Sequence, residues 1–148
     1  MAFLVKSIRR TLLVAIVFGI TSSSFSQDFE EIKEAFNKSY TLENEGEYGK
    51  AIETIKQIYQ EDDYIINLRL GWLNYSVGNF TESQAYYQKS IQLKPYSIEP
   101  RFGYVYPAAA LGNWSVVKTQ YLEILEIDPE NTLANYRLGM IYYGIEDY

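Results

Sequence analysis

Residues 67–71 read Asn-Leu-Arg-Leu-Gly, and residues 135–139 read Asn-Tyr-Arg-Leu-Gly. Four of the five positions are identical. A second pair of motifs, Gly-Asn-Phe at 78–80 and Gly-Asn-Trp at 112–114, is separated by half the distance between the first two segments. Self-similarity at a fixed period indicates a repeat architecture in which each unit is one supersecondary element. The offset from Gly78 to Gly112 is therefore taken as one repeat length, and it predicts how the rest of the chain is organised.

The segments between these motifs have the length and the flanking residues of helices. Pro95 and Pro129, also one repeat length apart, are expected to end two helices, because proline cannot continue one. Asn79 and Asn113 are expected to cap two others, with Glu82 in the capping-box position after Asn79. We expect helices at residues 29–44, 48–60, 64–77, 80–93, 98–111, 114–127 and 133–143.

These features resemble the tetratricopeptide repeat (TPR) family. Its units have a Leu-Gly pair in the first helix, a Gly-Asp/Asn-aromatic turn, small and aromatic residues in the second helix, and a final proline. The second unit matches best, at Leu70, Gly71, Gly78, Asn79, Phe80, Ser83, Tyr87, Ser90 and Pro95. The other matches are Ser39, Leu42, Gly46, Tyr48 and Ala51 in the first unit, and Gly112, Trp114, Tyr121, Asp128 and Pro129 in the third. Asn67 and Asn135 depart from the pattern, since the family prefers a large apolar residue there.

The resemblance implies an all-α fold, an α-solenoid of stacked antiparallel helix hairpins with about three and a half repeats and a right-handed superhelix. The expected repeat domain is 27–148, with units at about 29–63, 64–97 and 98–131 and a partial unit at 132–148. Asp147 and Tyr148 match the start of a further turn. Two interpretations follow: the chain is a fragment of a longer array, or the last helix packs on the third unit as an imperfect cap.

The second and third units differ in the residues expected where their helices meet. Gly71 and Ser83 are small and should let the helices of the second unit approach closely, while Tyr87 fills the space between units. Val105 and Val117 stand at the equivalent positions of the third unit. The helices of the third unit are therefore predicted to lie further apart.

Pro107 lies inside one of the predicted helices. A proline there loses one hydrogen bond and clashes with the carbonyl four residues back, which costs about 3 kcal/mol. That carbonyl belongs to Gly103, whose missing side chain is expected to ease the strain. We predict a bend between Gly103 and Leu111, with a merely local irregularity as the alternative.

Residues 1–26 have the three parts of a secretory signal peptide: a basic start, an apolar run at 11–20, and the small residues Ser24 and Ser26. Cleavage is predicted after Ser26, or alternatively after Ser24. An uncleaved membrane anchor is the competing interpretation, less favoured because a spanning helix needs roughly 20 apolar residues. The protein is therefore expected to be exported, either periplasmic or secreted, with a bacterial envelope suggested. Membrane contact is expected only if this segment is retained.

Composition argues against several classes of function. The chain has no histidine and no cysteine, so a Cys nucleophile, a Cys/His zinc site and histidine acid-base chemistry are excluded. After residue 26 the chain has 10 basic and 19 acidic residues, a net charge of −9. Such a charge repels phosphate backbones, so nucleic acid is not an expected partner. No catalytic, metal or cofactor site is predicted, and the chain is not expected to be an enzyme.

The family resemblance further implies a concave face, lined by the first helix of each hairpin, where peptides bind. The predicted partner-binding residues on this face are Phe36, Tyr40, Leu68, Arg69, Trp72, Tyr75, Phe102, Tyr106, Tyr136, Met140 and Tyr143. Aromatic residues are favoured anchors at protein interfaces, so a continuous aromatic groove for a protein or peptide is expected. Packing against the next helix is the alternative explanation for several of these side chains. Trp72 is the most informative, because the family usually has a polar residue there.

Chaperone-binding members of the family hold a C-terminal carboxylate with Lys, Asn and Arg side chains. The corresponding positions here are Phe36, Tyr40, Arg69, Glu99 and Gly103. Arg69 alone is basic, so a carboxylate clamp is not expected. An apolar or aromatic segment is the better ligand hypothesis.

The sequence thus predicts an exported interaction module or adaptor that binds a partner segment in its groove. The alternative is a structural spacer or oligomerisation segment of a larger envelope protein, with no peptide ligand of its own. In that case, end-to-end self-association through Tyr143 or Tyr148 is expected.

Overall fold

The computed structural model of the chain describes residues 29–144. The predicted signal peptide and the predicted turn at Asp147 and Tyr148 lie outside these residues. Within the described part, every regular element is an α-helix, and none of these helices is long and apolar enough to cross a membrane. A helix over residues 29–44 is followed by α2 (Tyr48–Gln57), α3 (Tyr64–Ser76), α4 (Phe80–Leu93), α5 (Glu99–Ala110), α6 (Trp114–Ile127) and α7 (Thr132–Tyr142).

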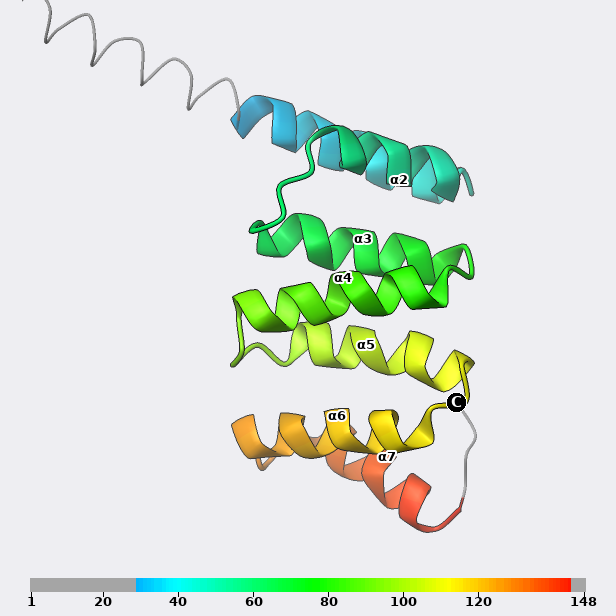
Figure 1. Cartoon of the computed structure of the whole chain (residues 1–148), viewed down its shortest axis with the longest axis vertical. Coiled ribbons are helices and arrows are strands. Elements are labelled where there is room, and N and C mark those ends of the chain that lie inside the picture. Colours follow the sequence, from blue (N-terminus) through cyan, green and yellow to red (C-terminus); the bar gives the residue numbers. More distant parts are fainter. Residues whose placement is uncertain (1–28, 145–148) are drawn as a thin grey trace, which may run out of the picture.

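The helices are stacked in sequence order from one end of the molecule to the other (Figure 1). From α2 onward, each helix contacts the next one, and α3 also contacts α5. The turns within the hairpins contain Gly78 and Gly112 with φ angles of +82° and +72°, a region that glycine enters without steric cost. The predicted all-α solenoid is confirmed, and the helices end within about three residues of their expected positions.

The entries into α3 and α7 are fastened by the same contacts, at equivalent positions two repeats apart. Asp63 and Asn131 precede these helices and accept a hydrogen bond from the backbone N–H three residues later, at 2.9 and 3.0 Å. Asn67 and Asn135 donate to the carbonyls four and six residues before them, at distances between 2.7 and 3.1 Å. The two asparagines that depart from the family pattern therefore hold the loop that leads into each helix.

The predicted capping by Asn79 and Asn113 is wrong. Both residues precede a helix, but neither side chain accepts a hydrogen bond from it. Their ψ angles of 65° and 61° differ from the extended geometry that directs a capping side chain toward the helix. The Asn79 amide instead donates to the side chain of Asn74, at 3.3 Å.

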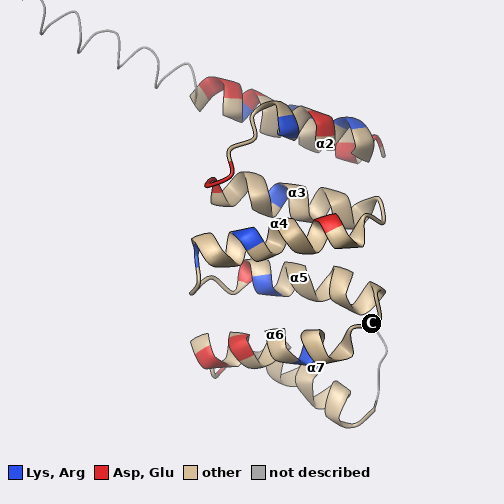
Figure 2. Ribbon diagram, viewed as in Figure 1, with Lys and Arg blue, Asp and Glu red and all other residues tan. Residues whose placement is uncertain are grey.

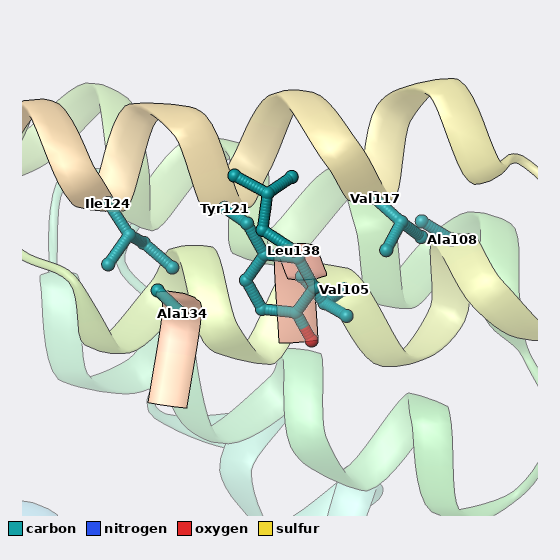
Figure 3. Close-up of a cluster of buried hydrophobic side chains, with 7 residues drawn as sticks. All are labelled: Val105, Ala108, Val117, Tyr121, Ile124, Ala134 and Leu138. Atoms are coloured by element: carbon teal, nitrogen blue, oxygen red, sulfur yellow. The ribbon is translucent and has the colours of Figure 1, made fainter. Parts of the chain in front are cut away.

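Two clusters of buried apolar side chains form the core, one toward each end of the stack. The first lies between α2 and α3 and contains Ala51, Ile52, Ile55, Ile66, Leu70 and Leu73. The second joins α5, α6 and α7 (Figure 3) and contains Val105, Ala108, Val117, Tyr121, Ile124, Ala134 and Leu138.

Tyr87 of α4 joins these two halves and is buried against two glycines. A Cβ atom placed on Gly71 of α3 would lie 2.9 Å from its ring, and one placed on Gly103 of α5 would lie 2.2 Å from it. The Ser83 hydroxyl donates to the Gly71 carbonyl at 2.7 Å. The expected roles of Gly71, Ser83 and Tyr87 are confirmed. Gly103 also makes room for the Tyr87 ring, and α5 continues through Pro107 to Ala110. The predicted bend after Gly103 stays a prediction.

The third hairpin is wider than the second, as predicted. α5 and α6 pack less closely than α3 and α4. Val105 and Val117 are both buried at this contact, where branched side chains keep the two backbones apart.

Candidate partner-binding groove

A groove with a volume of about 340 Å³ lies where the helix over residues 29–44, α3 and α5 meet. Seven of the eleven predicted binding residues line it. The complete lining is Phe36, Tyr40, Ile65, Leu68, Arg69, Trp72, Tyr87, Glu99, Phe102, Gly103 and Tyr106.

Three aromatic side chains form the rim of the groove. Tyr40 is 50% exposed, Trp72 is 39% exposed and Tyr106 is 48% exposed. Tyr75 packs beside them, with ring centroids 5.9 Å from Trp72 and 5.5 Å from Tyr106. Tyr75 therefore links α3 to α5 and supports the rim without itself lining the groove.

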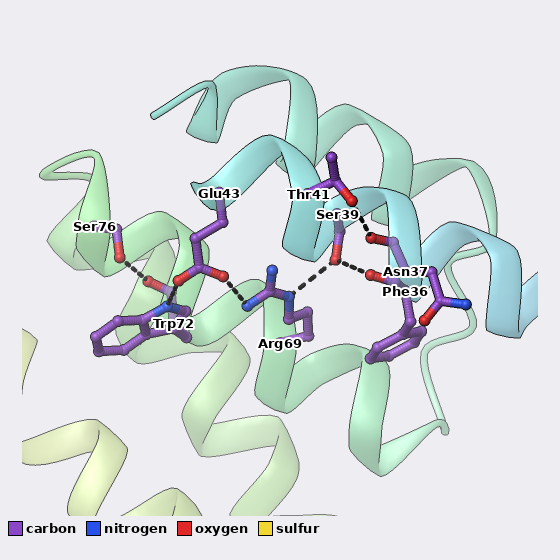
Figure 4. Close-up of polar contacts among 8 residues, drawn as sticks. All are labelled: Phe36, Asn37, Ser39, Thr41, Glu43, Arg69, Trp72 and Ser76. Carbon is purple, nitrogen blue, oxygen red and sulfur yellow. Dashed lines mark hydrogen bonds and ion pairs between the residues drawn. The ribbon is translucent and has the colours of Figure 1, made fainter. Parts of the chain in front are cut away.

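One charged side chain, Arg69, lies at the base of the groove and is paired with the neighbouring helix (Figure 4). Arg69 is only 6% exposed, and its Nη1 lies 2.5 Å from a carboxylate oxygen of Glu43, which is 18% exposed. Its Nε donates to the Ser39 hydroxyl at 3.1 Å, and its guanidinium lies 4.0 Å over the Tyr40 ring. Its Nη2 has no hydrogen-bond partner among the described residues. The positive charge is thus neutralised within the protein, although one nitrogen keeps its donor capacity.

Glu43 also determines where Trp72 lies. Its second carboxylate oxygen accepts a hydrogen bond from the Trp72 indole nitrogen at 2.5 Å (Figure 4). One carboxylate of the first described helix therefore holds both Arg69 and Trp72 of α3. Glu43 was not among the predicted binding residues. The available signal was chemical, because an indole N–H and a buried guanidinium each need an acceptor.

Glu99 is the remaining charged residue in the lining. It is exposed and occupies the first position of α5, and the Tyr64 hydroxyl donates to its carboxylate at 3.3 Å. Burial raises the pKa of the Tyr64 phenol, and burial raises the pKa of Tyr87 far more, with Tyr106 and Glu99 adding to the effect. Both phenols therefore stay neutral at physiological pH.

Three of the predicted residues, Tyr136, Met140 and Tyr143, do not line this groove. They belong to α7 and the residue after it, and among the described residues α7 makes no close backbone contact with α5. The groove therefore ends before α7, and the predicted binding role of these three residues stays a prediction. One repeat length after Gly103, α7 has Arg137. An arginine side chain leaves less room for a tyrosine ring against the helix than a glycine does.

Ile65, Tyr87, Glu99 and Gly103 line the groove but were not among the predicted binding residues. Glu99 could have been included from spacing alone, since it lies three and seven residues before Phe102 and Tyr106 on the same helix face. No group of acidic side chains within residues 29–144 is arranged to hold a metal ion.

Residues 65–97, which cover most of α3, the turn and α4, match the family model described as the tetratricopeptide repeat. The second hairpin is therefore similar to a tetratricopeptide repeat. The neighbouring hairpins stack on it as tetratricopeptide units do in a solenoid. A comparison with curated proteins finds no match.

Solved structures share the tetratricopeptide fold along most of the chain. One is the second TPR domain of human RPAP3 in complex with the HSP70 peptide SGPTIEEVD, with a TM-score of 0.68 and 15% identity, covering 78% of this chain and 98% of that one. Another is the first TPR of Spaghetti (RPAP3) bound to the HSP90 peptide SRMEEVD, with a TM-score of 0.68, 15% identity, and 80% and 95% of the two chains covered. A third is the Yersinia enterocolitica type III secretion chaperone SycD in complex with a peptide of the translocator YopD, with a TM-score of 0.65, 11% identity, and 79% and 91% covered. At these identities, the similarity shows the fold.

Proposed function

We propose that this chain is an exported tetratricopeptide interaction module that holds a segment of a partner protein in the groove between the first described helix, α3 and α5. The observation that carries the proposal is the exposed aromatic rim of Tyr40, Trp72 and Tyr106 around a hollow surface. Large aromatic side chains that remain accessible in a concave site are typical anchors for a partner. Solved proteins of the same fold are described as bound to peptides.

Structural packing alone does not explain the rim. Tyr87 shows what a purely structural tyrosine looks like in this fold, because its ring is almost completely buried between helices. The three rim residues each leave more than a third of their surface to solvent. That exposed apolar area would be covered when a partner binds, which favours association.

The rim is also held in place before any partner arrives. Glu43 fixes the Trp72 indole, and Tyr75 packs against both Trp72 and Tyr106. Side chains that are already ordered lose little conformational entropy on binding. The groove is therefore suited to capture a flexible segment of another protein.

The alternative function, a spacer or oligomerisation segment, is supported by a different surface. On α7 and just after it, Tyr136 and Tyr142 are exposed, and Tyr143 is 85% exposed. This face fits end-to-end association of two copies. It lies outside the groove, so the two functions can be separated by mutation.

The test is affinity capture with the full chain carrying a C-terminal tag, expressed in its own host. The double variant Trp72→Ala/Tyr106→Ala removes two of the rim residues. Tyr96→Ala is the matched control, because it deletes a tyrosine that is more exposed than any in the rim and lies outside the groove. Captured proteins are identified by mass spectrometry, and circular dichroism with thermal melting checks that each variant is folded.

We expect at least one protein that is captured by the wild-type chain and by Tyr96→Ala but lost with the double variant. Identical sets of captured proteins for all three would contradict groove binding. If self-association in analytical ultracentrifugation is then lost in Tyr143→Ala, the oligomerisation function replaces it.

A further inference from the structure

Of the helices that form the groove, α3 and α5 have few charged residues, whereas the helix over residues 29–44 has several (Figure 2). Arg69 is the sole charged residue of α3, and α5 has Glu99 and Arg101. Arg101 does not line the groove, and its guanidinium bonds to Glu123 of α6. Among the residues that line the groove, Arg69 and Glu99 are the charged ones, and Glu43 pairs with Arg69. These three groups therefore set the charge at the groove surface.

These three groups leave the groove with an excess of one negative charge. Arg69 and Glu43 form a pair in which both members are largely buried, so their fields cancel at short range. Glu99 is exposed, has no cation bonded to it among the described contacts, and accepts from the neutral Tyr64 hydroxyl at 3.3 Å. The Ser97 hydroxyl bonds to the same Tyr64 hydroxyl at 2.9 Å. This second hydrogen bond fixes the Tyr64 hydroxyl, which in turn orients the Glu99 carboxylate.

Aromatic faces lie on the same side of α5 as this carboxylate. Phe102 and Tyr106 follow Glu99 by three and seven residues and line the same groove. A cation attracted to Glu99 would therefore lie close to aromatic rings, and aromatic faces attract Lys and Arg side chains. A ligand carboxylate in that place would be repelled by the negative charge of Glu99. Arg69 would attract it little, because the charge of Arg69 is already paired with Glu43.

We propose that the partner segment carries a Lys or Arg next to an apolar or aromatic residue, with the cation at Glu99 beside Phe102 and the apolar side chain between Tyr40 and Trp72. This inference rests on the proposed groove function and specifies its ligand. It sets the chain apart from the RPAP3 domains, which are described with the acidic peptides SRMEEVD and SGPTIEEVD. The acidic chain as a whole also steers cationic segments toward it.

The experiment is selection from a random peptide library displayed on phage, with the full chain as the immobilised target. Parallel selections use Glu99→Lys and Trp72→Ala. The matched control is Glu82→Lys, since Glu82 is also an exposed acid in the first turn of a helix, and it does not line the groove. Glu99→Lys and Glu82→Lys change the net charge and the charge at a helix N-terminus in the same way. A difference between the peptides that they select is therefore due to the position of Glu99 in the groove.

Wild type and Glu82→Lys are expected to enrich Lys or Arg beside aromatic or aliphatic residues. Glu99→Lys is expected to lose that enrichment, and Trp72→Ala to lose selected peptides altogether. The strongest peptide is then measured by fluorescence anisotropy, with SGPTIEEVD as the acidic comparison because it contains no Lys or Arg. We expect Glu99→Gln to weaken binding of the selected peptide by about two- to fivefold, as for an exposed ion pair, and SGPTIEEVD to bind neither the variant nor the wild type.

The possible failures are distinguishable. Peptides that depend on Trp72 but show the same residue preferences on wild type and Glu99→Lys would overturn the cationic ligand and leave the groove function intact. Enrichment of acidic peptides without Lys or Arg, or binding of SGPTIEEVD to the wild-type chain, would overturn it as well. No peptide enriched above an uncoated surface would contradict the groove function and this inference together.

Discussion

Tyr87 and Tyr121 occupy the same position in successive repeats, and each is 3% exposed. Their surroundings differ. Tyr87 is pressed between Gly71 and Gly103. At the equivalent positions around Tyr121 the chain has Val105 and Arg137, and the Tyr121 ring packs edge-on against Phe102, with centroids 6.2 Å apart.

The difference shows how one repeat motif can produce two kinds of surface. Around Tyr87, the glycines let α3 and α5 come into contact, and the groove forms across them. Around Tyr121, side chains replace both glycines, and in the described part of the chain α5 and α7 share a side-chain cluster but make no close backbone contact. The hairpin motif determines each pair of helices, whereas the residues facing the tyrosine determine how close the next hairpin lies.

The largest effect on stability is expected for Tyr87→Ala. Removal of this ring leaves a cavity between α3, α4 and α5, and the free energy of unfolding should fall by about 3–5 kcal/mol. Urea denaturation followed by circular dichroism measures it. A loss below about 1 kcal/mol, typical of surface positions, would contradict the assignment of Tyr87 to the packing position.

Gly103→Ala tests the close approach directly. The new methyl group would overlap a ring that has the Gly71 backbone behind it, so the ring has nowhere to move. Overpacking of this kind costs about 1–3 kcal/mol, despite the better helix propensity of alanine. The same denaturation measurement applies, and an unchanged or higher midpoint would show that α5 lies further from Tyr87 than the structure indicates.

The burial of the Tyr87 phenol should make the stability of the protein depend on pH in the alkaline range. Its pKa is raised in the folded state, mainly by burial, whereas in the unfolded chain it ionises near pH 10. Ionisation of Tyr87 therefore has no effect on the free energy of unfolding below about pH 9. Above pH 10 it lowers that free energy, because Tyr87 releases its proton in the unfolded chain but retains it in the folded chain.

Tyr87→Phe removes this contribution. Between pH 10 and 11, the variant should lose less stability than the wild type, by at most about 1.4 kcal/mol. Urea denaturation series at pH 8, 10 and 11 for both proteins provide the measurement. Parallel pH profiles would show that the Tyr87 hydroxyl is hydrated in the folded state.

The smallest expected effect is at Gly139, which repeats the Leu-Gly motif of Gly71. A Cβ atom placed on Gly139 meets nothing within 4 Å, because no ring lies against it in the described structure. Gly139→Ala should therefore raise stability by about 0.5–1 kcal/mol through helix propensity alone. Destabilisation equal to that of Gly71→Ala would reveal that a side chain covers α7 in solution.

Much of the fold could be predicted because its signals are local. The helix ends follow from Gly78 and Gly112 and from the prolines after α4 and α6, whose effects act within a few residues along the chain. The aromatic rim was also predicted, since three- to four-residue spacing places Trp72 and Tyr106 on one face of their helices. The predicted side-chain caps failed, because capping depends on the ψ angle of Asn79 and Asn113 and not on residue type alone.

The repeat period and the helical hairpins could be predicted from the sequence alone, as could most of the aromatic side chains of the groove. The absence of histidine and cysteine likewise excluded catalysis by those residues. The tertiary structure was needed to show that Glu43 neutralises Arg69 and holds Trp72, that Glu99 is the remaining charge in the lining, and that α7 lies outside the groove. These contacts join residues on different helices. They depend on how closely the helices approach, and a glycine against a tyrosine ring, as at Gly71 and Gly103, allows a closer approach without altering the repeat pattern.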